Sequence, residues 1–213
     1  MLFRCTPKIF CVGRNKTGTT SLGAALRNLG FKVAPQAPAE LLTPEWARRD
    51  FKPLIRFCRK YDAFQDAPFS LDFTYVAMDQ AFPGSRFILT ERDSAEVWYE
   101  SAVRFSAKLL GVERVPTAED LGNFEYCGQP ERKGELLRRC QLVYGITPDK
   151  VFDRDIYIAH YENHNRSVRH YFRYRPDDLL ILNLKQPDAM ERLCRFVGRP
   201  YNGQKMPHEN KSC

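Results

Sequence analysis

The stretch that decides the fold runs from Ile9 to Leu22 and reads IFCVGRNKTGTTSL. Its apolar start ends at a loop bounded by Gly13 and Gly18, and a helical pattern begins directly after the second glycine. In a strand, loop and helix joined in this way, backbone N–H groups of the loop and the positive end of the helix converge on one anion. The sequence therefore predicts a phosphate-binding loop.

The lysine of this loop distinguishes it from the loop of nucleoside triphosphatases. Their pattern, GxxxxGK followed by Ser or Thr, places the lysine directly after the second glycine. Here Thr19 holds that position, and Lys16 lies inside the loop. We therefore expect the loop to hold a phosphate, but not the Mg²⁺-bound β- and γ-phosphates of ATP.

Outward from this loop, short apolar runs alternate with helical patterns. Strands are predicted at 8–12, 31–34, 63–65, 86–90 and 179–184, and helices at 19–29, 71–82, 94–110, 134–144, 147–174 and 188–197, with two more between 38 and 61 and a loop at 111–133. This alternation predicts an α/β fold with three layers, α/β/α, around a central parallel sheet. Ligands of such sheets lie at the carboxyl ends of the strands, where the Gly13 loop, Asp66 and Arg92 all fall.

Composition favours a single domain and a small anionic ligand. The 213 residues carry a formal net charge of +7, dispersed through mixed-sign helices without a basic tail, so nucleic acid is not the expected partner. The seven cysteines form no CxxC pair, which fits a reducing compartment and indicates neither zinc nor disulfides. No run approaches the ~20 apolar residues of a membrane span. Residues 1–10 are interrupted by basic residues and proline, so we expect neither signal peptide nor anchor, and a cytoplasmic location.

A second candidate anion site follows the predicted strand at 86–90. Arg92 stands at its carboxyl end, and Ser101 lies on the next predicted helix. Arginine offers a fork of donors and serine adds one hydroxyl. Two anion sites at neighbouring strand ends fit a nucleotide that carries phosphates at two positions.

Two motifs now resemble a known family. Residues 13–21, GRNKTGTTS, resemble the 5′-phosphosulfate loop of sulfotransferases that use 3′-phosphoadenosine-5′-phosphosulfate (PAPS), and residues 82–93, FPGSRFILTERD, resemble their 3′-phosphate motif. Weaker matches, such as LCRFVGRP at 193–200, extend over most of the chain except 111–144. The resemblance implies a P-loop-like sulfotransferase fold over 1–213, PAPS as donor, 3′-phosphoadenosine-5′-phosphate (PAP) as product, and no obligatory metal.

The resemblance also implies a set of nucleotide-binding residues. They are Arg14, Asn15, Lys16, Thr17, Gly18, Thr19 and Thr20 in the loop, with Arg92 and Ser101; the serine stands one position further from the arginine than is usual in the family. Lys16 is expected to stabilise charge at the bridging oxygen during sulfuryl transfer.

The general base has several candidates. Asp66 ends the predicted strand beside the loop and could accept the acceptor's proton, or it could form an Asx turn or helix cap. His164 faces inward on the predicted helix at 147–174, as a catalytic group or as a hydrogen-bonded core histidine. Glu91 is a third candidate, or a partner of Arg92. His160 and His164 are four residues apart but have no third ligand in view, so no metal site is predicted.

Two other functions remain open at this stage: a Mg²⁺-dependent kinase or nucleotidase with a degenerate loop, and a non-catalytic nucleotide-binding protein on the same fold. For the sulfotransferase, the expected acceptor is a hydroxyl or amine of a small molecule or carbohydrate. Residues 111–144 are the predicted lid or acceptor wall.

Overall fold

The computed structural model describes residues 7–209, so residues 1–6, on which much of the signal-peptide prediction falls, lie outside the described chain. The chain forms two compact units. One contains residues up to Asp93 and from His164 onward, and the other is Ser94–Asn163.

The first unit is built on a four-stranded sheet in the order β2-β1-β3-β4. The strands are β1 (Ile9–Cys11), β2 (Ala63–Phe64), β3 (Arg86–Thr90) and β4 (Leu179–Leu182). All pairs are parallel, and Ile9 of the central β1 is in register with both Ala63 and Arg86. The α/β class with a central parallel sheet is confirmed.

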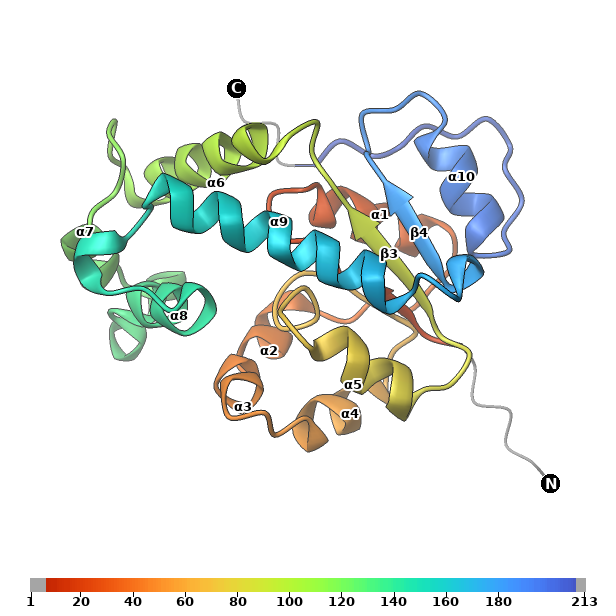
Figure 1. Cartoon of the computed structure of the whole chain (residues 1–213), viewed down its shortest axis with the longest axis horizontal. Coiled ribbons are helices and arrows are strands. Elements are labelled where there is room, and N and C mark those ends of the chain that lie inside the picture. The colour runs from red at the N-terminus through yellow and green to blue at the C-terminus, as the bar shows by residue number, and fades with distance from the viewer. Residues whose placement is uncertain (1–6, 210–213) are drawn as a thin grey trace. The chain divides into compact units, whose positions relative to one another are not determined.

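Helices cover both faces of this sheet because successive strand residues are apolar on both sides. Phe10 and Phe87 pack on the face covered by α4 (Lys52–Cys58), α5 (Thr74–Ala81) and the end of α9 (Arg154–Tyr171). Ile9 and Ile88 pack on the opposite face, under α1 (Thr19–Asn28) and α10 (Ala189–Phe196). Figure 1 shows α1 and α10 lying together beside β3 and β4. The three-layer arrangement is as predicted.

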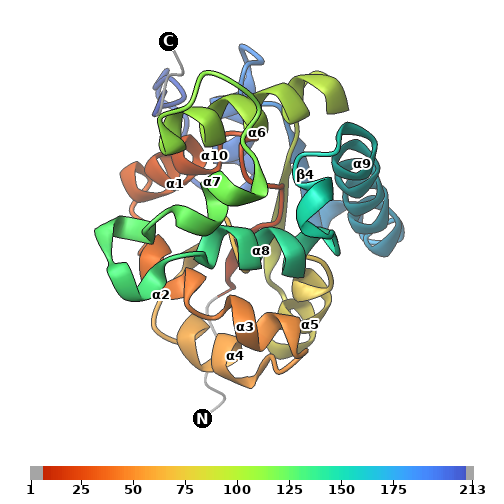
Figure 2. The same ribbon diagram turned by 90° about the vertical axis from the view of Figure 1, so that its left-hand side faces the viewer.

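The segment before β2 differs from the prediction. It holds three short helices, α2 (Gln36–Glu40), α3 (Thr43–Ala47) and α4, grouped with α5 in Figures 1 and 2. Pro44 and Pro53 stand in the first turns of α3 and α4, where a missing N–H costs nothing, so these prolines begin helices rather than interrupt them. The predicted strand at 31–34 is reduced to one bridge, Val33 with Ala63.

The second unit is helical, with α6 (Ala95–Leu110), α7 (Ala118–Asn123), α8 (Glu135–Tyr144) and the start of α9. Ser94 caps α6 by accepting the Val97 N–H at 3.2 Å. The prediction of a loop at 111–133 is wrong for residues 118–123, which form α7. Thr117 and Asp120 form a capping box at the start of this helix. The helix predicted from 147 begins only at Arg154, because Phe152 adopts a left-handed φ of 58° after a short 3₁₀ turn. The 3₁₀ turns are Tyr126–Gly128, Pro130–Arg132, Pro148–Lys150 and, in the first unit, Pro176–Asp178.

Candidate functional site

The loop between β1 and α1 is held by hydrogen bonds of its own residues and of β3. The Thr17 hydroxyl donates to the Arg14 carbonyl at 2.5 Å and lies 2.5 Å from the hydroxyl oxygen of Thr90, the last residue of β3. The first bond of α1 runs from the Leu22 N–H to the Gly18 carbonyl at 3.0 Å, and the first turn holds no acidic residue. The N–H groups of that turn therefore face the loop without a nearby carboxylate in the helix itself, as an anion site requires.

Steric constraints explain why both positions at the ends of the loop are glycine. A Cβ on Gly13 would lie 2.4 Å from the carbonyl oxygen and 2.5 Å from the nitrogen of Thr90. Gly18 has a φ of 99°, which a side chain rarely tolerates. Gly13 therefore permits the ends of β1 and β3 to approach closely, and Gly18 permits the turn into α1.

Lys16 lies at the centre of the loop in a left-handed conformation, with a φ of 65°. Its carbonyl accepts a hydrogen bond from Nε of Arg92 at 2.6 Å. Burial and, to a smaller extent, Arg92 lower the pKa of its ammonium group, and the carboxylates of Asp66 and Glu40 oppose them, with a net pKa of about 8. The structure thus brings together Lys16, Arg92 and Asp66, three residues that the sequence singled out.

Asp66 follows β2 and also has a left-handed φ, of 60°. One carboxylate oxygen accepts the Ala67 N–H at 2.8 Å, and the other accepts the Thr19 hydroxyl at 3.2 Å. Burial raises the pKa of this carboxyl group, against the effects of the Ala67 N–H and of Lys16. The side chain therefore binds the N–H of the next residue, which is neither an Asx turn nor a helix cap, and at the same time contacts the first residue of α1.

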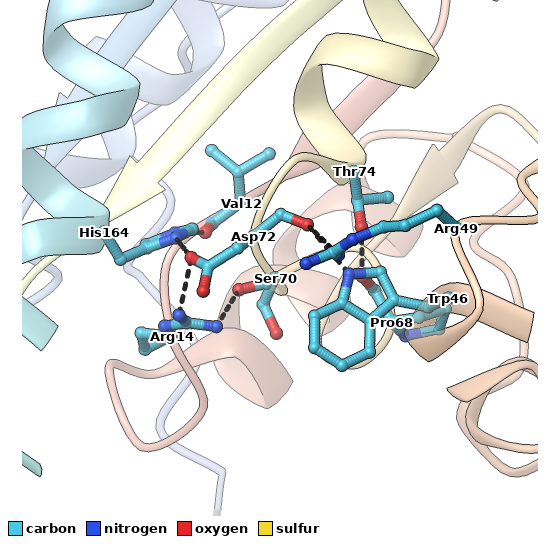
Figure 3. Close-up of polar contacts among 9 residues, drawn as sticks. All are labelled: Val12, Arg14, Trp46, Arg49, Pro68, Ser70, Asp72, Thr74 and His164. Carbon is cyan, nitrogen blue, oxygen red and sulfur yellow. Dashed lines mark hydrogen bonds and ion pairs between the residues drawn. The ribbon is translucent and has the colours of Figure 1, made fainter. Parts of the chain in front are cut away.

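Arg14 and His164 meet at Asp72, a residue that the sequence did not single out (Figure 3). Arg14 is 2% exposed, and its guanidinium donates to the Ser70 carbonyl at 2.9 Å and to Oδ1 of Asp72 at 2.8 Å. His164 is equally buried, and its Nε2–H donates to the Val12 carbonyl at 2.7 Å while Nδ1 lies 2.9 Å from the same Asp72 oxygen. Burial and Arg14 lower the pKa of His164, and Asp72 opposes them.

A comparison with protein families identifies the family to which this site belongs. A family model described as a sulfotransferase domain matches residues 8–213, essentially the whole chain. This chain belongs to the sulfotransferase family. The sulfotransferase domain makes the protein a transferase of sulfuryl groups and agrees with the P-loop-like α/β fold. No curated protein matches the chain.

The remaining predicted site residues of this sulfotransferase are Ser101, Glu91, Asn15 and Thr20. Ser101 is on α6 in the second unit, and its contribution to nucleotide binding stays a prediction. Glu91 forms its ion pair with Arg169, and burial raises the pKa of its carboxyl group. Asn15 is half-buried and Thr20 exposed, both within or beside the loop.

Two further findings concern the described residues, 7–209. No helix among them is long and apolar enough to cross a membrane. In the same part of the chain, no group of three or more His, Cys, Asp or Glu side chains is arranged to hold a metal ion.

Sequence reasoning missed Asp72 and Thr90 as parts of the site. Asp72 is 58 residues from Arg14 and 92 from His164, so no local spacing relates the three. Thr90 ends the predicted strand at 86–90, and its role follows only from the parallel register that places it beside the loop. The need for a carboxylate partner follows from the burial of Arg14, which only the structure shows.

Proposed function

We propose that this sulfotransferase transfers the sulfuryl group of PAPS to a hydroxyl or amine of a small-molecule or carbohydrate acceptor. The observation that carries the proposal is the placement of Lys16. It lies in the loop between β1 and α1, beside the Asp66 carboxylate and against Arg92.

The loop suits the 5′-phosphosulfate of the donor. The first turn of α1, which begins with Thr19, contributes N–H groups, and the exposed Thr20 contributes a hydroxyl. Thr17 and Thr19 contribute by holding the loop in shape, because their hydroxyls donate to the Arg14 carbonyl and to Asp66. A pKa of about 8 keeps Lys16 mostly protonated at neutral pH, as an anionic donor requires. In this proposal Arg92 and Ser101 bind the 3′-phosphate, and Arg14 and Asn15 complete the loop.

Transfer is an in-line displacement. The acceptor oxygen or nitrogen forms a bond to sulfur, and the bond from sulfur to the bridging oxygen breaks, so PAP leaves with that electron pair. Lys16 stabilises the charge that develops on the bridging oxygen. Asp66 takes the proton of the acceptor, and its raised pKa makes it a stronger base than an exposed aspartate. No metal is needed for any of these steps.

The proposal treats residues 1–213 as one sulfotransferase domain, in which 111–144 forms the acceptor wall. A cytoplasmic location, which was inferred from the sequence alone, is part of the same proposal. The exposed face of Asp66 is the expected entry point for the acceptor, because this side chain is only partly buried.

The test is a turnover assay with ³⁵S-labelled PAPS and a panel of phenols, sugars, amines and lipid alcohols, in EDTA. We expect label transfer to at least one acceptor class with the wild type and with Lys60→Ala, a control at an exposed lysine, and loss of transfer with Lys16→Ala. PAP binding without transfer to any acceptor would favour a non-catalytic protein. Phosphoryl transfer from Mg²⁺–ATP would favour the kinase alternative.

A further inference from the structure

Lys16 and Asp66 lie on two separate segments, residues 12–18 and residues 66–74, and one buried cluster connects these segments. The cluster consists of Arg14, Asp72 and His164, in which a single carboxylate oxygen faces both basic groups (Figure 3). We propose that this Arg14–Asp72–His164 cluster positions Lys16 relative to Asp66, and that His164 is a positioning residue and not the general base. The inference rests on the proposed function for the roles of Lys16 and Asp66.

On the loop side, the cluster holds both residues that flank Gly13. His164 donates to the Val12 carbonyl at 2.7 Å, and the side chain of Arg14 leaves the loop to reach the other segment. Since His164 belongs to α9, the loop is tied to a helix in the core as well as to the sheet. A change at His164 therefore acts on Val12, four residues before Lys16, and through Asp72 on Arg14, two residues before Lys16.

On the other side, the cluster holds the segment that begins with Asp66. Arg14 donates to the Ser70 carbonyl, and the Ser70 N–H in turn donates to the Asp66 carbonyl at 3.0 Å. The backbone carbonyl of Asp72 accepts the indole N–H of Trp46 at 2.8 Å, so this residue is held through its backbone and its side chain at once. Bonds of this kind leave the segment little freedom to move independently of the loop.

The backbone conformation of both segments requires stabilising contacts from the surrounding structure. Lys16, Asp66 and Phe73, the neighbour of Asp72, have φ angles of 65°, 60° and 63°. Non-glycine residues in this region cost free energy and persist where the surrounding contacts determine them. Each of the three lies close in sequence to a cluster member, since Lys16 is two residues after Arg14 and Asp66 and Phe73 are six residues before and one after Asp72, so the cluster supplies such contacts.

The surroundings of His164 exclude direct contact with an acceptor. Its side chain has 0% exposure, whereas that of Asp72 is 33% exposed. Both ring nitrogens already face oxygen atoms, one of a carbonyl and one of a carboxylate. With one nitrogen on a backbone carbonyl and the other on a carboxylate oxygen, no ring nitrogen is turned toward an acceptor molecule.

Two variants separate the two contacts of His164. In His164→Asn the side-chain amide can replace Nδ1 toward Asp72 but does not reach the Val12 carbonyl, and in His164→Gln the amide can replace Nε2 toward Val12 but not Nδ1. The control is Val168→Ala, one turn along α9, which shortens a fully buried side chain of the same helix but removes neither hydrogen-bond contact of His164. Amide hydrogen exchange is measured on the ligand-free proteins, with PAP affinity and turnover measured in parallel.

We expect a different pattern for each variant. His164→Asn raises exchange in peptides covering the loop and weakens PAP binding about tenfold, because the loop loses its tie to α9. His164→Gln raises exchange at 66–74 and lowers kcat about tenfold or more with KM for PAPS nearly unchanged, because Asp66 is displaced. Val168→Ala lowers the melting temperature without either local effect.

The positioning role would be overturned if both His164 variants behaved like Val168→Ala. In that case amide exchange would not rise selectively in either segment, and kcat would equal that of the wild type. Should neither His164 variant fold, Asp72→Asn takes the place of His164→Gln. It keeps Oδ1 but removes the charge that strengthens both contacts, so we expect the same direction of change with a smaller size. The exchange patterns need no nucleotide, so their presence in a protein that fails to bind PAP would refute the proposed function and keep the structural link.

Discussion

The unusual pKa of Lys16 gives a prediction that separates its role from that of an ordinary surface lysine. Burial moves this pKa from 10.5 to about 8. A lowered pKa means that the charged form is lost as pH rises through 8, within a range in which an exposed lysine stays protonated. Anionic PAP binds the charged form, so its affinity falls as pH increases above that value.

The magnitude follows from the charged fraction. With a pKa of about 8, that fraction falls about tenfold for each pH unit above 8, so the dissociation constant of PAP rises up to about a hundredfold between pH 7 and pH 10. Lys16→Arg keeps its charge over the whole range, because the guanidinium pKa exceeds ~12. In that variant the dissociation constant changes less than about threefold over the same interval.

Calorimetric titration with PAP at each pH, in EDTA and at constant ionic strength, measures both proteins. Circular dichroism at each pH confirms that the fold is intact. A wild-type affinity that is flat to pH 10, or an equal decline in Lys16→Arg, would refute the assignment of this pH dependence to Lys16.

The other predictions concern the loop, the base and the second anion site. Gly13→Ala places a Cβ against the Thr90 backbone, so we expect a loss of unfolding free energy of about 2 kcal/mol in urea titration and loss of PAP binding. Gly23→Ala meets only side-chain atoms, of Gln65 at 3.4 Å and Arg27 at 3.9 Å, and is expected to be neutral or stabilising; equal effects of the two substitutions would contradict the steric argument. Asp66→Asn removes the proposed base, so kcat falls about 10²-fold or more while PAP affinity, measured by calorimetry, is retained; a variant with normal kcat would exclude this base. Arg92→Lys keeps a charge but loses the Nε donor to the Lys16 carbonyl, so PAP binds about tenfold more weakly, and affinity equal to wild type would show that this contact is dispensable.

The sequence predicted those parts of the fold in which a local sequence pattern is compatible with only one kind of structure. The run at 86–90 is apolar at successive positions, and the structure explains this because Phe87 and Ile88 pack on opposite covered faces of the sheet. The loop with Lys16 was recognisable because glycine positions and the start of a helix define it. Its neighbours Asp66 and Arg92 followed from the rule that strand ends of a parallel sheet meet at one edge.

The parts that could not be predicted depend on distant contacts or on competing local signals. Helix α7 has a readable capping box at Thr117 and Asp120, but glycines and a proline nearby outweighed it. The break before α9 depends on the left-handed Phe152, which no residue preference indicates. The partner of Arg14 could not be identified, because Asp72 becomes its neighbour only when segment 66–74 folds against the loop.

The central claim, that the loop holds the nucleotide of PAPS, is tested most directly by calorimetric titration of the wild type with PAP in EDTA, with Mg²⁺–ATP titrated in a separate experiment. The account predicts a dissociation constant in the micromolar range or below for PAP, lost in Lys16→Ala and retained in Lys60→Ala, and no comparable binding of Mg²⁺–ATP. Tight binding of Mg²⁺–ATP with no binding of PAP would contradict it.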